Sequence, residues 1–210
     1  SKQNDFINIS LKSILTVITF TPLFLFYSSY FVYGQSLNIK KEYWENGQIR
    51  LEESYKEDQL EGLSRYFYEN GIKMSEVNYK IGKKNGLKSH WYTNGKIWYE
   101  RRYNYGVKDG LETEWYYNQR VKLKRHFKKG KKDGFSNSWY ENGQQESGKL
   151  FKLGIKDGLF TSWYKNGNLN IEEHYLDGEK DGLYTSWYES GQKKLEELPC
   201  KKILNFNHGE

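Results

Sequence analysis

The stretch that decides the fold is residues 91–114, WYTNGKIWYERRYNYGVKDGLETE, after which Trp115 begins the same pattern again. Its opening pair of large aromatic residues recurs every 24 residues without an insertion. The pair occupies positions 43–44, 67–68, 91–92, 115–116, 139–140, 163–164 and 187–188. A fixed period of this length indicates a repeat protein, in which each unit packs against its neighbours.

Two dipeptides divide each repeat. Asn-Gly follows the aromatic pair, as in Asn94-Gly95, and Asp-Gly or Asn-Gly recurs between the pairs, as in Asp109-Gly110. Such dipeptides favour tight hairpin turns because both central residues then adopt positive φ. Two turns in 24 residues predict two strands per repeat, along which side chains alternate between faces. We therefore predict an all-β fold, an elongated single-layer antiparallel meander of tandem 24-residue β-hairpins.

The composition supports a folded chain with a mild positive charge. Aromatic residues make up 18% of the 210 residues, with 19 Tyr and 7 Trp, whereas disordered chains are poor in aromatic side chains. The net charge is +6, from 33 basic and 27 acidic residues. This balance permits an anionic partner without requiring one, and it makes nucleic acid an unlikely ligand.

The amino-terminal part differs from the repeats. No charged residue lies between Lys12 and Lys40, and residues 14–26 are almost wholly apolar. This pattern predicts a helical signal peptide over residues 1–34, cleaved after Gly34, or a retained membrane anchor, with a buried core element as a third alternative. Both leading alternatives export the protein to the periplasm, the cell envelope or the medium. With one cysteine, Cys200, the chain forms no internal disulfide.

The repeat pattern W-Y-x-N-G, then E-x-x-Y-x-x-G-x-K-D-G-L, resembles the MORN repeat. It is more closely similar to the bacterial variant in YwqK-family antitoxins. The resemblance covers residues 41–198, with a linker at 35–40 and a cap or tail at 199–210. It implies a scaffold, membrane-associated or protein-binding role and no catalytic residues. The sequence departs from the pattern at Gln119 and Gly148, and an antitoxin role conflicts with the predicted export.

The repeat columns account for the residues that could otherwise suggest chemistry. His126 and His174 share a column but stand two repeats apart, too far to bind one metal ion. Calcium needs six to eight oxygens in one loop, and each Asp-Gly turn offers one carboxylate. The glutamate column that includes Glu100 is expected to pair with nearby lysines. We therefore predict a protein that is not an enzyme and holds neither a metal nor a cofactor.

Two rows of side chains are candidates for binding. A lysine precedes each Asp-Gly or Asn-Gly dipeptide, and these lysines are expected to line one long edge as a site for an anionic ligand: Lys84, Lys108, Lys132, Lys156 and Lys180. A tyrosine stripe, expected to remain partly exposed, is the candidate surface for a protein partner or a second copy: Tyr92, Tyr116, Tyr140 and Tyr164.

These features lead to one main hypothesis and two alternatives. The main one is an exported, non-enzymatic scaffold that binds a protein partner. The first alternative is a peripheral binder of an acidic membrane surface or an anionic glycan through the lysine row. The second is an antitoxin-like protein that neutralises a toxin.

Overall fold

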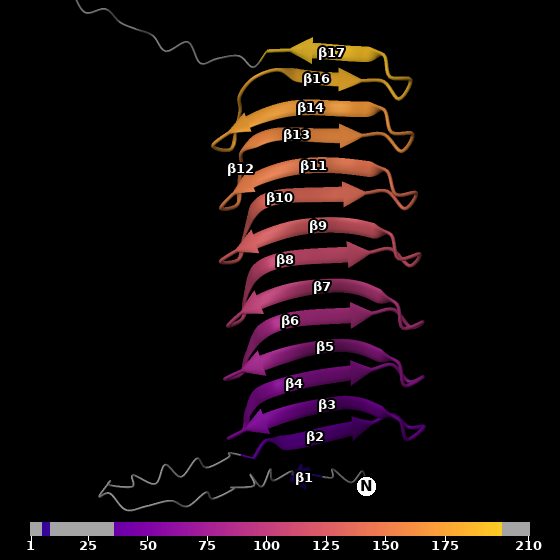
Figure 1. The fold of residues 1–210 in the computed structure, drawn as a ribbon, viewed down its shortest axis with the longest axis vertical. Coiled ribbons are helices and arrows are strands. Elements are labelled where there is room, and N and C mark those ends of the chain that lie inside the picture. The colour runs from indigo at the N-terminus through magenta and orange to yellow at the C-terminus, as the bar shows by residue number, and fades with distance from the viewer. Residues whose placement is uncertain (1–5, 9–35, 199–210) are drawn as a thin grey trace, which may run out of the picture.

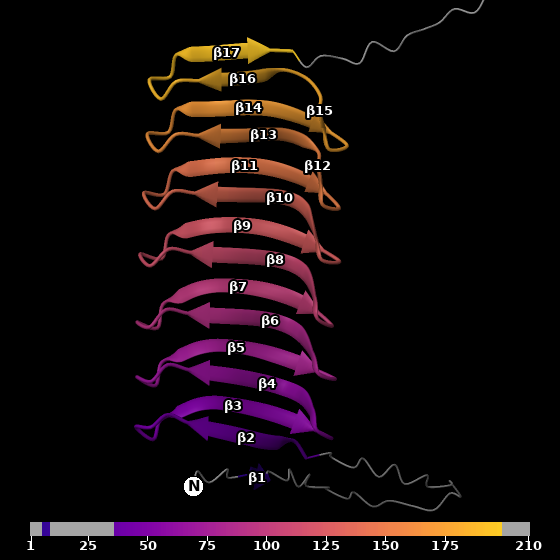
Figure 2. The same ribbon diagram turned by 180° about the vertical axis from the view of Figure 1, so that it is seen from behind.

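The structure is a computed structural model, and it describes residues 6–8 and 36–198. These residues form one 17-stranded antiparallel sheet in which successive strands pair along the chain. Every strand from β2 to β17 is visible from both sides, so this sheet is a single layer (Figures 1 and 2). The predicted all-β meander of hairpins is therefore confirmed. The amino-terminal helix, the proposed cleavage after Gly34 and the carboxy-terminal cap lie outside the described residues.

The strands repeat with little variation in length. Their bounds are β1 (Phe6–Asn8), β2 (Asn38–Tyr43), β3 (Ile49–Lys56), β4 (Gln59–Phe67), β5 (Lys73–Lys80), β6 (Lys83–Trp91), β7 (Ile97–Asn104), β8 (Val107–Trp115), β9 (Val121–Lys128), β10 (Lys131–Trp139), β11 (Gln145–Lys152), β12 (Ile155–Lys156), β13 (Gly158–Trp163), β14 (Leu169–Leu176), β15 (Glu179–Lys180), β16 (Tyr184–Trp187) and β17 (Lys193–Glu197). The short strands β12 and β13 both pair with β11, and β15 and β16 both pair with β14.

The Asn-Gly dipeptides form the hairpins along one edge of the sheet, at the right in Figure 1. In the β6–β7 hairpin the Gly95 N–H donates to the Tyr92 carbonyl, and the Tyr92 N–H donates to the Lys96 carbonyl. Gly95 alone has positive φ, +81°, so this is a three-residue loop closed by a glycine rather than a turn with two positive φ values. Asn94 accepts a hydrogen bond from the Lys96 N–H at 3.0 Å. Asparagine is therefore selected here for its side-chain oxygen.

The prediction that Asp-Gly forms the second hairpin turn is wrong. The turn between β7 and β8 lies at Tyr105-Gly106, where both residues have positive φ, +44° and +88°. Asp109-Gly110 lies inside β8, where the register jumps: Tyr103 pairs with Lys108, but Arg101 pairs with Glu112. The extra residues form a bulge, and Gly110 supplies its φ of +105°.

The column that includes Asp109 ties one repeat to the next. The side-chain oxygens of Glu61, Asn85 and Asp133 accept the N–H of a turn residue 20 positions later, at 2.7, 3.3 and 3.0 Å. The backbone adds a parallel bond, such as that from the Gly106 N–H to the Lys84 carbonyl at 2.7 Å. Each turn on the left edge of Figure 1 is thus held by the preceding repeat.

Side chains alternate between two faces with different chemistry. We call the side that carries the row of Lys84 and its equivalents, together with the Tyr103 column, the lysine face. The few buried apolar side chains all lie on it: Leu51, Val77, Phe127, Phe160 and Tyr175. The opposite face is buried chiefly at small polar residues: Ser89, Thr113, Thr161 and Thr185. With so thin a core, backbone pairing between repeats carries much of the cohesion.

Candidate ligand-binding face

The five lysines predicted to form a row do form one. The row lies on the lysine face rather than on the turns, because the turns precede these residues by two or three positions. Each ammonium lies over an aromatic ring of the neighbouring strands: Lys84 over Tyr103 at 5.5 Å, Lys108 over Phe127 at 4.6 Å, Lys132 over Phe151 at 4.8 Å, Lys156 over Tyr175 at 4.1 Å and Lys180 over Tyr184 at 5.0 Å. These contacts hold the charges close to the sheet surface.

The middle of the lysine face carries an excess of positive charge. From β6 to β13, alternation and strand register place eight cationic side chains on it: Lys84, Lys88, Arg101, Lys108, Arg125, Lys132, Lys149 and Lys156. The same strands contribute two carboxylates to this face, Glu112 and Glu114. The excess therefore lies in one region, whereas the sequence suggested charge spread evenly along the row.

Glu112 is the centre of this charged region. Its side chain is fully buried, and it pairs with both Arg101 and Arg125. The Arg125 Nε lies 2.9 Å from its carboxylate, and the Lys108 ammonium lies 3.5 Å from it. Burial raises the pKa of this carboxyl, but the hydrogen bonds from Arg101 and Arg125 outweigh burial and leave the pKa below its usual range. The sequence pattern did not single out this residue.

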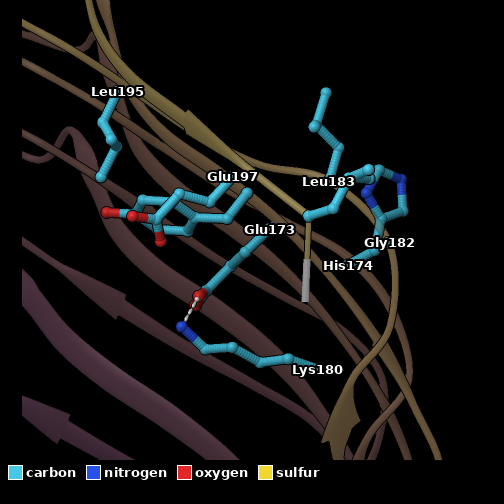
Figure 3. Close-up of a pocket in the computed structure, with 9 residues that line it drawn as sticks. Glu173, His174, Lys180, Gly182, Leu183, Leu195 and Glu197 are labelled. Carbon is cyan, nitrogen blue, oxygen red and sulfur yellow. Dashed lines mark ion pairs between the residues drawn. The ribbon is translucent and has the colours of Figure 1, made fainter. Parts of the chain in front are cut away.

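At the other end of the row, Lys180 has a different environment. Its ammonium pairs with Glu173 at 3.0 Å, beside a hollow of about 370 Å³ between β14 and β17. Figure 3 shows this pair on one side of the chain together with Glu197, while His174 and Leu183 lie on the other side. Two carboxylates border this hollow with one lysine. Lys180 is thus the one predicted lysine that the structure separates from the basic region.

The tyrosine stripe is largely a ladder between repeats. The hydroxyls of Tyr68, Tyr92, Tyr116, Tyr140 and Tyr164 each donate to the backbone carbonyl of the aromatic residue 23 positions later, at 2.8–2.9 Å. These side chains are half-buried, whereas Tyr188, for which no such bond is present in the described residues, is 51% exposed. Four predicted partner-binding residues therefore have a structural role that the sequence did not reveal.

One aromatic cluster departs from the repeat pattern. His90 stacks on Tyr99 with ring centroids 4.6 Å apart, and Trp98 lies at 6.0 Å from His90 and 5.8 Å from Tyr92. Tyr117 lies 5.2 Å from Tyr92. Most other repeats carry serine, glutamate or lysine at the positions of His90, Trp98 and Tyr117. The cluster is thus specific to β6–β8.

This cluster gives a pH-dependent stability. Burial, with added repulsion from Lys88, Arg101 and Lys84, lowers the pKa of His90 to about 4. The unfolded chain binds this proton at a higher pH, so the stabilisation is complete above about pH 6.5 and is lost as the pH falls towards 4. We expect the urea midpoint to fall over this window, and His90→Tyr, which copies Tyr66 of an earlier repeat, to flatten the profile. An unchanged profile would contradict the assignment to His90.

The described residues offer little for metal or membrane chemistry. Within residues 6–8 and 36–198, no group of three His, Cys, Asp or Glu side chains could hold a metal ion. No helix in the same residues is long and apolar enough to cross a membrane.

The fold and this face define a tandem-repeat binding module: an open sheet with two solvent-facing sides. Comparison with protein families agrees. Five segments, residues 38–57, 60–80, 84–105, 156–177 and 180–198, match the family model described as MORN repeat variant. The chain thus carries MORN-variant repeats, which are in general protein- or membrane-binding modules and are typically non-enzymatic. No curated protein matches the chain.

The matched segments leave out residues 106–155. This interval contains Glu112, Gln119 and Gly148, and it contributes much of the positive charge on the lysine face. Its fold nevertheless continues the same hairpins. At Gln119 the φ is +69°, and the side-chain amide donates to the Ile97 carbonyl at 3.0 Å. The interval therefore keeps the scaffold while its side chains diverge.

Proposed function

We propose that the chain is a non-enzymatic binding scaffold that engages an acidic protein partner through the lysine face between β6 and β13. The observation that carries this proposal is the excess of eight cations over two carboxylates there. Charge of one sign on a surface raises the rate of encounter with an oppositely charged partner and selects against like-charged ones.

A protein partner suits this face better than a lipid surface does. Lysines that bind anionic membranes act as exposed, mobile charges at the surface. Here the ammonium groups of Lys84, Lys108, Lys132 and Lys156 lie over rings, in half-buried side chains fixed at intervals of one hairpin. Such fixed spacing favours a partner with its own fixed pattern of carboxylates. The proposal includes export, as the apolar amino-terminal segment predicts, and it therefore disfavours the antitoxin-like alternative.

The proposal predicts a face-specific effect of charge reversal. The double variant Lys84→Glu/Lys88→Glu should weaken binding of a fluorescent poly-L-glutamate probe at low salt by about tenfold, because it places acids on the binding face. Fluorescence anisotropy measures the affinity. The matched control is Lys122→Glu/Lys124→Glu, which makes the same charge change with residues of β9, where Lys124 lies on the opposite face.

Equal losses in the two double variants would contradict the proposal, because net charge alone would then explain binding. Flotation of the protein with anionic vesicles, lost in the Lys84→Glu/Lys88→Glu variant while poly-L-glutamate binding stays unchanged, would favour the membrane alternative. A protein that binds neither probe would exclude the lysine face as an anion-binding surface.

A further inference from the structure

A cavity of about 330 Å³ opens on the lysine face between β9 and β14. Its cationic lining consists of Arg125, Lys132, Lys149 and Lys156. Ser136 lies among them with only 8% of its surface exposed. Nearby, the hydroxyls of Ser138 and Ser147 lie 2.8 Å apart. The cavity thus combines four positive groups with three hydroxyls, which is a donor set for an oxyanion.

The repeat itself explains what is special about this cavity. Glu112 pairs across the sheet with Arg101 on one side and Arg125 on the other, and Lys108 precedes it by four residues. Exactly one period later, Ser136 pairs with Arg125 on one side and Lys149 on the other, and Lys132 precedes it by four residues. The cage of three cations is therefore kept, but the carboxylate at its centre is replaced by serine.

The positive charges of the second cage are not neutralised from within the described residues. Lys132, Lys149 and Lys156 form no ion pair with a carboxylate in residues 36–198. The two acids at the rim are already paired, Glu112 with Arg101 and Arg125, and Glu173 with Lys180. Burial lowers the pKa of Lys132, and the neighbouring Arg125 and Lys149 lower it further. Like charges held together in this way favour uptake of an anion.

We propose that the cage around Ser136 binds a phosphate-type oxyanion, in the position that the Glu112 carboxylate occupies one repeat earlier. The inference rests on the proposed function, because it assigns one anionic group on the same face. A phosphate monoester carries a charge near −2 at neutral pH and three strong acceptor oxygens. It matches several cations and hydroxyls better than a single carboxylate does. The cavity also has room for part of the group that carries the phosphate.

The decisive variant is Ser136→Glu, which restores the carboxylate of the preceding repeat. In the full chain it should fill the cage from inside, so it should raise the melting temperature of the ligand-free protein. It should also weaken binding of inorganic phosphate by at least about tenfold. Asn137→Glu is the matched control, because it makes the same charge change on the same strand but on the opposite face. Lys132→Met, which removes one cation of the cage, should also weaken phosphate binding.

Isothermal titration calorimetry and thermal unfolding, each with and without inorganic phosphate, measure these effects. Phosphate that neither binds nor raises the melting temperature of the wild-type chain overturns the inference, as does a Ser136→Glu variant that binds phosphate as tightly as wild type. Acetate that competes as well as phosphate also overturns it. Glucose 6-phosphate and phosphatidylcholine vesicles containing phosphatidic acid distinguish a soluble from a lipid-borne phosphate, and tighter binding of either one supports the site.

The two proposals can fail separately. Loss of phosphate binding in Ser136→Glu with poly-L-glutamate binding retained supports the cage as a distinct site. A wild-type chain that binds poly-L-glutamate but not phosphate overturns the cage alone. A wild-type chain that binds phosphate but not poly-L-glutamate supports the cage and overturns the acidic-partner proposal.

Discussion

Replacing Glu112 with alanine is expected to lower the free energy of unfolding by about 3–5 kcal/mol, because removal of one partner leaves buried opposite charges unpaired. Arg101, Arg125 and Lys108 all contact this carboxylate, and its side chain has no exposed surface. Without it, the cations repel one another in a partly desolvated position. The loss is large compared with the total stability of a typical domain. Urea unfolding followed by tryptophan fluorescence measures it.

Glu114→Ala is the matched control for this prediction. Glu114 lies two residues further along β8 on the same face, but it is half-buried and forms one ion pair, with Arg125 at 3.7 Å. An exposed or half-exposed pair of this kind contributes about 0–1 kcal/mol. A second variant, Arg101→Leu/Glu112→Leu/Arg125→Leu, should recover much of the lost stability, because it removes the buried charges together. Equal losses at Glu112 and Glu114 would show that the buried cluster has no special role.

The period of 24 residues was enough to predict the meander, because hairpin chemistry is local. Asn-Gly after an aromatic pair indicates a turn, whatever lies elsewhere in the chain. The second turn was misplaced because Asp109-Gly110 has the same local signature, although it forms a bulge inside β8. What distinguishes the two dipeptides is the register with the previous repeat. Register depends on pairing across strands, which a dipeptide does not encode.

The candidate site could be predicted only in part, for a related reason. Lys84 and its equivalents stand out as a column, so the row was visible in the sequence. Glu112 and Ser136 share a column that also holds Ser64, Lys88, Phe160 and Tyr184, and so diverse a column indicates no function. Their meaning appears when strand register brings Arg125 beside both of them. Differences between repeats become informative once neighbouring strands are in place.

The tyrosine ladder illustrates the same limit for the opposite class of residue. A column repeated without change could serve a partner or the scaffold, and periodicity does not separate the two. The structure shows that Tyr92, Tyr116, Tyr140 and Tyr164 each donate a hydroxyl proton to the next repeat. Each bond joins units that otherwise meet through backbone pairing and small contacts. The ladder therefore contributes to the coupling between neighbouring repeats.

Replacing these four tyrosines with phenylalanine is expected to lower the free energy of unfolding by about 4 kcal/mol in total, at about 1 kcal/mol for each lost hydrogen bond. The four sites are separated by one repeat each, so their effects should add. Because a repeat protein is stabilised by its unit interfaces, the loss should also make unfolding less cooperative and reduce the urea m-value.

The control for the ladder lies within the same column. Tyr188 has no hydroxyl partner in the described residues and is 51% exposed, so Tyr188→Phe should leave the unfolding free energy within about 0.5 kcal/mol of wild type. Single variants at Tyr92 and Tyr164 should each lose about as much as one quarter of the quadruple variant. If the quadruple variant unfolds like Tyr188→Phe, the hydroxyls do not couple the repeats. The stripe would then regain its place as a candidate binding surface, since selection for tyrosine over phenylalanine would need a partner outside this chain.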